Sequence, residues 1–157
     1  MRATLSILLA LIAAASALAG ESRVDPALFA AAQKFMPREI ATNQLVRALE
    51  SGLWNSNRTA LAVSIAQPKR SVIFVFLRQS NATYLAVDAS GVEGGNFGVW
   101  GRPRTDYERY ETTPVEWLYR DDGRFQVVMR TRAWRAGQRY TVSEPLLISR
   151  NGIVMYR

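Results

Sequence analysis

The most apolar stretch in the body of the chain is a run of six residues, Val72 to Leu77, with the sequence VIFVFL. The run is too short for a typical helix, and its β-branched, aromatic and leucine side chains favour a strand that is covered on both faces. Turn-forming residues flank it on both sides, QPKR at 67–70 and QSNA at 79–82. Residues 59–90 are therefore predicted to form a three-stranded meander whose central strand lies in the core.

From Val115 onward, residues of two kinds alternate along the chain: Val115, Trp117 and Tyr119 alternate with Glu116, Leu118 and Arg120. This is the pattern of half-buried strands. Three turn signals divide this part of the chain: DDGR at 121–124, RAGQ at 135–138 and NG at 151–152. A further short strand is predicted at 97–101, after a glycine-rich connection at 90–96. Residues 104–114 show no clean periodicity, and they fit either an edge strand or an ordered loop.

Two short amphipathic helices are predicted between residues 25 and 52. Asp25 followed by Pro26 is typical of a helix start, with the aspartate as N-cap and proline in the first turn. Pro37 ends the first helix and can also begin the second, and Gly52 fits the position just after a helix C-cap. Residues 53–57 are expected to form a loop. The fold class is thus α+β: N-terminal short helices packed on a mainly antiparallel β-sheet of about seven or eight strands.

The first 19 residues have the organisation of an export signal. Arg2 supplies a positive n-region, residues 5–15 form an apolar h-region, and Ala17-Leu18-Ala19 matches a cleavage site. The apolar run is shorter than the roughly 20 residues that a spanning helix needs. We expect a signal peptide at 1–19, a single domain at 20–157 and a periplasmic or secreted bacterial protein, without a membrane span after cleavage.

The composition excludes several classes of catalytic site. The chain has neither cysteine nor histidine, so it lacks Ser-His-Asp and Cys-His catalytic machinery and the usual zinc or copper ligands. No cofactor or metal site is predicted. The formal net charge is +7 for 157 residues, and loss of Arg2 with the signal leaves +6.

Arginines alternate with aromatic residues between positions 100 and 140, although acids in the same window reduce its net charge. Arginine and aromatic side chains together suit an anionic polymer or a protein interface. Eighteen arginines against two lysines in the whole chain also fit a general compositional bias and a solvated strand face. The candidate binding residues are Arg102, Arg104, Tyr107, Arg109, Tyr110, Trp117, Arg130, Arg132 and Trp134.

A carboxylate pair would be the remaining route to catalysis, as in a two-carboxylate glycoside hydrolase. The spacing selects no pair among the acids that are available. These acids are Glu93, Asp106, Glu108, Glu111, Glu116 and Glu144.

The layout resembles that of the VirK family of small exported bacterial proteins. The resemblance rests on the signal peptide, on ALESG at 48–52, on TPVEWLYRDDG at 113–123 and on a terminal strand that begins with Gly152-Ile153. The cysteines expected of that family are absent. The resemblance implies an exported, non-catalytic protein associated with the envelope or a host.

These observations favour an exported, non-enzymatic binding or interaction protein of the bacterial envelope. The expected partner is another envelope or extracellular protein, bound through a sheet edge or through arginine and aromatic contacts. The alternatives are binding of an anionic polymer such as lipopolysaccharide or wall polysaccharide through the arginine and aromatic face, and glycoside hydrolysis. Nucleic acid is not an expected partner for an exported protein.

Overall fold

A computed structural model of the chain describes residues 24–90 and 107–155. The predicted signal peptide, the glycine-rich connection and the strand expected at 97–101 lie outside the described residues. The elements are α2 (Pro26–Phe35), α3 (Thr42–Glu50), β1 (Leu53–Trp54), β2 (Ala60–Ala66), β3 (Ser71–Arg78), β4 (Tyr84–Asp88), β5 (Arg109–Leu118), β6 (Phe125–Arg135), β7 (Gln138–Ile148) and β8 (Val154–Met155).

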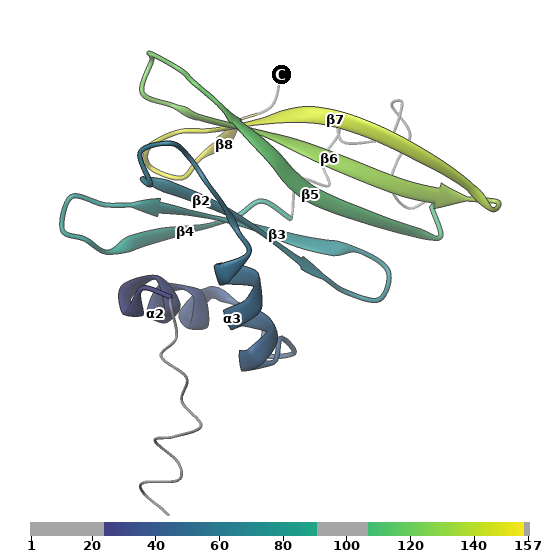
Figure 1. The fold of residues 1–157 in the computed structure, drawn as a ribbon, viewed down its shortest axis with the longest axis horizontal. Coiled ribbons are helices and arrows are strands. Elements are labelled where there is room, and N and C mark those ends of the chain that lie inside the picture. Colours follow the sequence, from purple (N-terminus) through teal and green to yellow (C-terminus); the bar gives the residue numbers. More distant parts are fainter. Residues whose placement is uncertain (1–23, 91–106, 156–157) are drawn as a thin grey trace, which may run out of the picture.

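The architecture is α+β, with three layers stacked in the order helices, first sheet, second sheet (Figure 1). The first sheet has the antiparallel order β1-β2-β3-β4, and the second contains β5, β6 and β7 with the short β8 paired to the end of β7. The expectation of one sheet is therefore corrected. The helices pack on the first sheet alone, because the second sheet already covers its other face.

The apolar run in β3 is explained by this central position. Alternate residues of the run face opposite layers: Phe74 and Phe76 pack with the helices, whereas Val75 and Leu77 pack with the second sheet. All four are at most 2% exposed. The meander predicted over 59–90 is confirmed as β2-β3-β4, with Val75 opposite Ala62 on one side and Val87 on the other.

The N-terminal helices match their predicted positions, but their boundaries differ. Asp25 caps α2 as predicted, since its Oδ1 accepts a hydrogen bond of 2.8 Å from the backbone N–H of Ala27. Pro37 follows the end of α2, yet it does not begin α3, whose N-cap is Ala41 without a side-chain hydrogen bond. Within the described residues, no helix is both long and apolar enough to cross a membrane.

Two strand assignments were decided by tertiary pairing. Leu53 and Trp54, expected in a loop, form β1 because they pair with Ala62 and Leu61 of β2. Residues 109–114, left open between strand and loop, form the first part of β5. A bulge between Pro114 and Glu116 shifts the register with β6, so side chains on either side of it do not follow one simple alternation.

The predicted turns of the second sheet are confirmed. Gly123, Gly137 and Gly152 all have positive φ, between 73° and 82°, as tight turns of this kind require. The turn between β6 and β7 has only two residues, Ala136 and Gly137, and Arg135 is opposite Gln138 at its base. This turn fixes which residues of β6 and β7 lie side by side.

Candidate functional site

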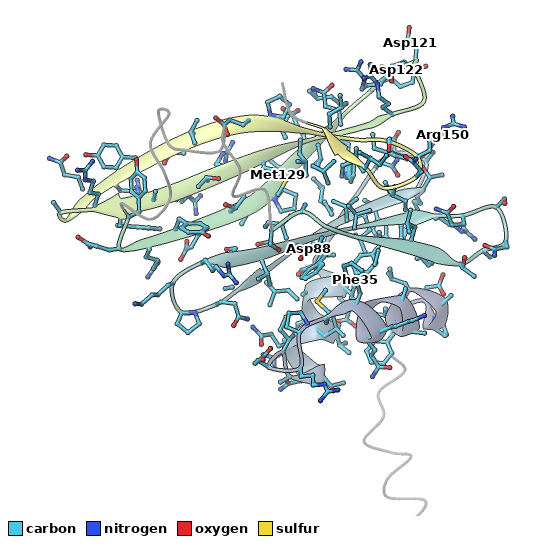
Figure 2. All side chains as sticks on the ribbon, turned by 180° about the vertical axis from the view of Figure 1, so that it is seen from behind. Phe35, Asp88, Asp121, Asp122, Met129 and Arg150 are labelled. Atoms are coloured by element: carbon cyan, nitrogen blue, oxygen red, sulfur yellow. The ribbon has the colours of Figure 1, made fainter. Side chains whose placement is uncertain are left out.

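The face of the second sheet that points away from the first sheet carries a group of arginines at one end of β5, β6 and β7. The pattern of burial along β6 defines this face: Thr131 and Ala133 are buried, whereas Arg130 and Arg132 are exposed. The buried residues face the rest of the protein. Their exposed neighbours therefore lie on an outer face on which the structure places no other described element (Figures 1 and 2).

Strand register groups these side chains in three rows. Trp134 lies between Arg109 of β5 and Arg139 of β7 in the first row. Arg132 lies between Glu111 and Thr141 in the second, and Arg130 between Thr113 and Ser143 in the third. Directly opposite residues of antiparallel strands are about 5 Å apart, and alternate residues of one strand about 7 Å. We call Arg109, Arg130, Arg132, Trp134 and Arg139 the arginine strip.

The ends of the strip differ in how their charges are paired. The guanidinium carbon of Arg109 lies 4.4 Å from the ring centroid of Trp134, and its Nη2 donates to Glu111 at 2.5 Å. Within the described part of the chain, no carboxylate lies within ion-pair distance of Arg130, Arg132 or Arg139. Four arginines and Glu111 leave a net charge of +3 on this face. Three cations there are available to an anionic partner.

The nine residues predicted for binding are divided among several places. Four of them, Arg109, Arg130, Arg132 and Trp134, come together in the strip. Arg102 and Arg104 lie outside the described residues. The other three are Tyr107, Tyr110 and Trp117.

Those three lie away from the outer face. The ring of Tyr107 contacts Tyr140, on the inner side of the sheet, at a centroid distance of 6.2 Å. Tyr110 faces the same inner side, opposite Ala133. Trp117 lies at the other end of the sheet, where its Nε1–H donates to the carbonyl of Leu53 at 2.8 Å and joins the two sheets.

Arg139 belongs to the strip but was not among the nine residues. The signal that places it there is the two-residue turn at Ala136 and Gly137, because a turn of that length fixes Arg139 opposite Trp134. Thr141 and Ser143 extend the same exposed row of β7 and add hydroxyl groups beside the arginines.

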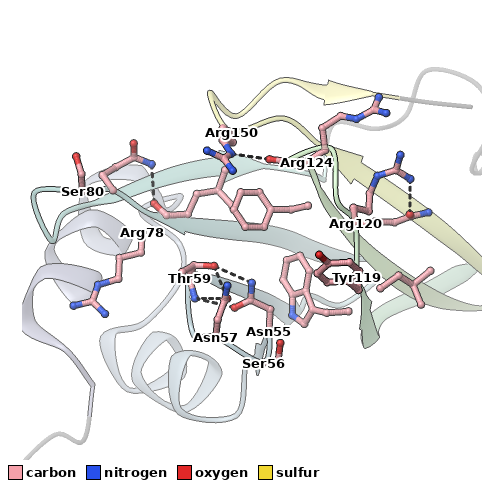
Figure 3. A pocket seen from close by; sticks show the side chains of 17 residues that line it. Asn55, Ser56, Asn57, Thr59, Arg78, Ser80, Tyr119, Arg120, Arg124 and Arg150 are labelled. Atoms are coloured by element: carbon pink, nitrogen blue, oxygen red, sulfur yellow. Dashed lines mark hydrogen bonds between the residues drawn. The ribbon is translucent and has the colours of Figure 1, made fainter.

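A second arginine cluster lines a groove of about 580 Å³ at the opposite end of the two sheets (Figure 3). Four arginines line it, Arg78, Arg120, Arg124 and Arg150, and the last three are already engaged. Asp122 accepts hydrogen bonds from both Arg120 and Arg124, and Arg150 Nε donates to the carbonyl of Gly123 at 2.9 Å. Hydrogen bonds from Arg120 and then Arg124 hold the pKa of Asp122 well below its ordinary value. This cluster organises the turn between β5 and β6, and it leaves fewer free cations than the strip.

The described residues give little support to carboxylate catalysis. None of the aspartates and glutamates among them is buried. Glu108 accepts from the backbone N–H of Ala136, and Glu111 is paired with Arg109. No group of three or more potential metal ligands occurs among residues 24–90 and 107–155.

Comparisons with known proteins return no match from protein-family models, curated proteins or solved structures. The VirK-like resemblance therefore remains a prediction.

Proposed function

We propose that the protein is an exported, non-enzymatic domain that binds a linear anionic polymer through the arginine strip. Export rests on the signal predicted at residues 1–19. The observation that carries the proposed ligand is the set of three arginines, Arg130, Arg132 and Arg139, that have no carboxylate partner among the described residues and share one exposed face with Trp134.

The chemistry of the strip favours a polymer over a small ligand. The strip is part of a sheet face, so it offers successive contacts along β6 instead of an enclosed cavity. Guanidinium groups form paired hydrogen bonds with carboxylates, sulfates and phosphates. Repeated acidic units of a polysaccharide are able to meet Arg130 and Arg132 in turn, because these two arginines are spaced about 7 Å apart along the strand.

Binding to a linear polyanion tests this proposal. The full mature chain is titrated with polygalacturonate, and with uncharged dextran as the matched polymer, over a range of salt concentrations. Binding releases counterions that are condensed on the polymer, so the affinity falls as the salt concentration rises. In nucleic acids, each arginine–phosphate contact that is lost reduces the slope of log K against log salt by roughly 0.7–0.9, and we expect a similar change here. The double variant R130Q/R132Q should therefore bind more weakly with a flatter salt dependence.

The chain offers a control with the same change in charge. Arg38 and Arg47 are exposed in the helical layer, so R38Q/R47Q removes two charges without touching the strip. Trp134→Ala should weaken binding while the salt slope is kept, because the indole contributes contact area and no charge. Equal affinities of the two double variants, or equal binding of dextran, would overturn the proposal.

A protein partner is the second candidate function. Arginine and tryptophan are enriched in protein interfaces, and the strip combines both. A pull-down from envelope and culture-fluid extracts distinguishes the two functions. A single protein that is retained at high salt by the wild type, and lost with R130Q/R132Q, would support a protein interface. Acidic polysaccharide retained only at low salt would support the polymer.

A further inference from the structure

A pocket of about 670 Å³ lies between the helices and one end of the first sheet, and none of its lining residues belongs to the arginine strip. Its apolar part is contributed by Leu28 of α2 and Leu49 of α3, which are each 2% exposed. Trp54 and Tyr84 add two aromatic rings whose centroids are 6.4 Å apart. Clefts that bind small molecules commonly have this volume, with apolar and aromatic walls and a few polar groups.

One polar group of the pocket is Arg58, which lies in a strained turn. Its φ of 55° is in the left-handed region, where glycine is favoured and an arginine is strained. Asn55 holds the turn: its carbonyl accepts from the N–H of Arg58 at 3.0 Å, and its Oδ1 accepts from the N–H of Thr59 at 2.8 Å. The conformation brings the Arg58 guanidinium carbon to 4.8 Å from the Trp54 ring centroid.

A second cation lies beside it. The backbone N–H of Arg78 donates to the carbonyl of Thr59 at 2.8 Å, which places the end of β3 next to the turn that carries Arg58. Arg78 is also directly opposite Tyr84 in the β3–β4 register, and its side chain extends towards the helices (Figure 3). Arg58 and Arg78 both line the pocket.

Neither arginine forms an ion pair with a described residue. In the described ranges, no aspartate or glutamate lies within ion-pair distance of Arg58 or Arg78. Asp25 and Glu50 also line the pocket. Both oxygens of Asp25 are engaged, since Oδ1 accepts from the backbone N–H of Ala27 and Oδ2 accepts from the Tyr84 hydroxyl at 3.1 Å. Glu50 is an exposed residue at the end of α3. The donors that remain for a ligand are therefore those of the two arginines.

We propose that this pocket binds a small organic anion with an apolar body. The carboxylate, or an equivalent anionic group, lies between the guanidinium groups of Arg58 and Arg78. The aromatic or acyl body of the same molecule packs on Leu28 and Leu49 and against the rings of Trp54 and Tyr84. This site is independent of the arginine strip, and neither requires the other.

A matched pair of probes tests the inference on the full mature chain. We use 2-naphthoate and 2-naphthamide, which share the same aromatic body and differ in charge. Binding is measured by calorimetry, and its position is read from NMR shifts of the Trp54 indole N–H. Naphthoate should bind at least about tenfold more tightly than the amide, because hydrogen bonds to charged groups are the stronger ones.

Substitution of Arg58 separates binding from folding. Arg58→Gly removes the cation and relieves the left-handed strain, so the melting temperature should be unchanged or raised while naphthoate affinity falls about tenfold or more. Arg78→Gln should cause a similar loss. Arg38→Gln is the control, since Arg38 is exposed and is not among the residues that line the pocket, and it should bind like the wild type. The inference is overturned if R58G and R78Q retain wild-type affinity, if the amide binds equally, or if Trp54 does not respond.

Discussion

Replacement of Gly52 by alanine gives a direct test of how the helical layer joins the first sheet. An added Cβ would lie 2.6 Å from Leu61 Cδ1, 3.1 Å from Val63 Cγ2 and 3.2 Å from the carbonyl oxygen of Ala62. Leu61 and Val63 are fully buried, so neither side chain has free space to move into. The substitution therefore forces an overpacked contact between the end of α3 and β2.

The expected cost follows from two opposing effects. Overpacking of a filled core costs about 1–3 kcal/mol. Gly52 does not have the positive φ of the turn glycines, so alanine restricts the unfolded chain and returns about 0.4–1 kcal/mol. The net loss is about 1–2 kcal/mol. For a domain of this size, that loss lowers the melting temperature by roughly 3–7 °C.

Denaturant and thermal unfolding measure the effect, and a double-mutant cycle assigns its cause. Leu61→Ala removes the atom that clashes with the new Cβ, so the G52A/L61A variant should lose less stability than the two single variants together. Gly137→Ala serves as the comparison, since it has a φ of 74° but no atom within 4 Å of an added Cβ. Wild-type stability for G52A, or additivity in the cycle, would refute the packing argument.

Two further predictions concern the second sheet. Thr112 and Thr131 share a buried hydrogen bond of 3.0 Å between their hydroxyls. Thr131→Val should destabilise the fold by about 1–3 kcal/mol, because it leaves the Thr112 hydroxyl without a partner. The double variant T112V/T131V should recover much of that loss, as measured by urea unfolding. Asp122, whose pKa is held low by Arg120 and Arg124, contributes stability above its ordinary pKa near pH 4 that is lost as the pH falls further. The stability difference between wild type and Asp122→Asn should accordingly shrink between about pH 6 and about pH 2, and a constant difference would contradict this role.

Local signals in the sequence were enough to place most strands and turns. The Asp-Gly and Asn-Gly pairs at Gly123 and Gly152 predicted tight turns, and the six-residue run in β3 predicted a strand covered on both faces. The turns depend on residues that are adjacent in the chain, and the strand depends on the burial of one continuous segment. Both features can therefore be recognised in the amino-acid sequence alone.

The site depended on information that local patterns do not carry. Alternation separates Arg130 and Arg132 from Thr131, but it does not say which neighbours lie across the sheet. Strand register decided that Arg139 joins Trp134 in the strip, whereas Trp117 lies at the far end between the two sheets. The helix-side pocket likewise needed α2, α3 and β4 to come together from distant parts of the chain.

Gly52 shows, in a single residue, the difference between what local sequence predicts and what tertiary packing decides. The sequence placed this glycine just after a helix, and the helix does end at Glu50 with Ser51 as its C-cap. The expected reason for the glycine was the conformational freedom of a helix end, yet the structure gives a steric one, the close approach of Leu61. The sequence by itself determined the elements and their turns, since these follow from backbone preferences and periodic burial. Only the tertiary structure decided the two stacked sheets, the arginine strip and the pocket, because these depend on which distant side chains occupy the same space.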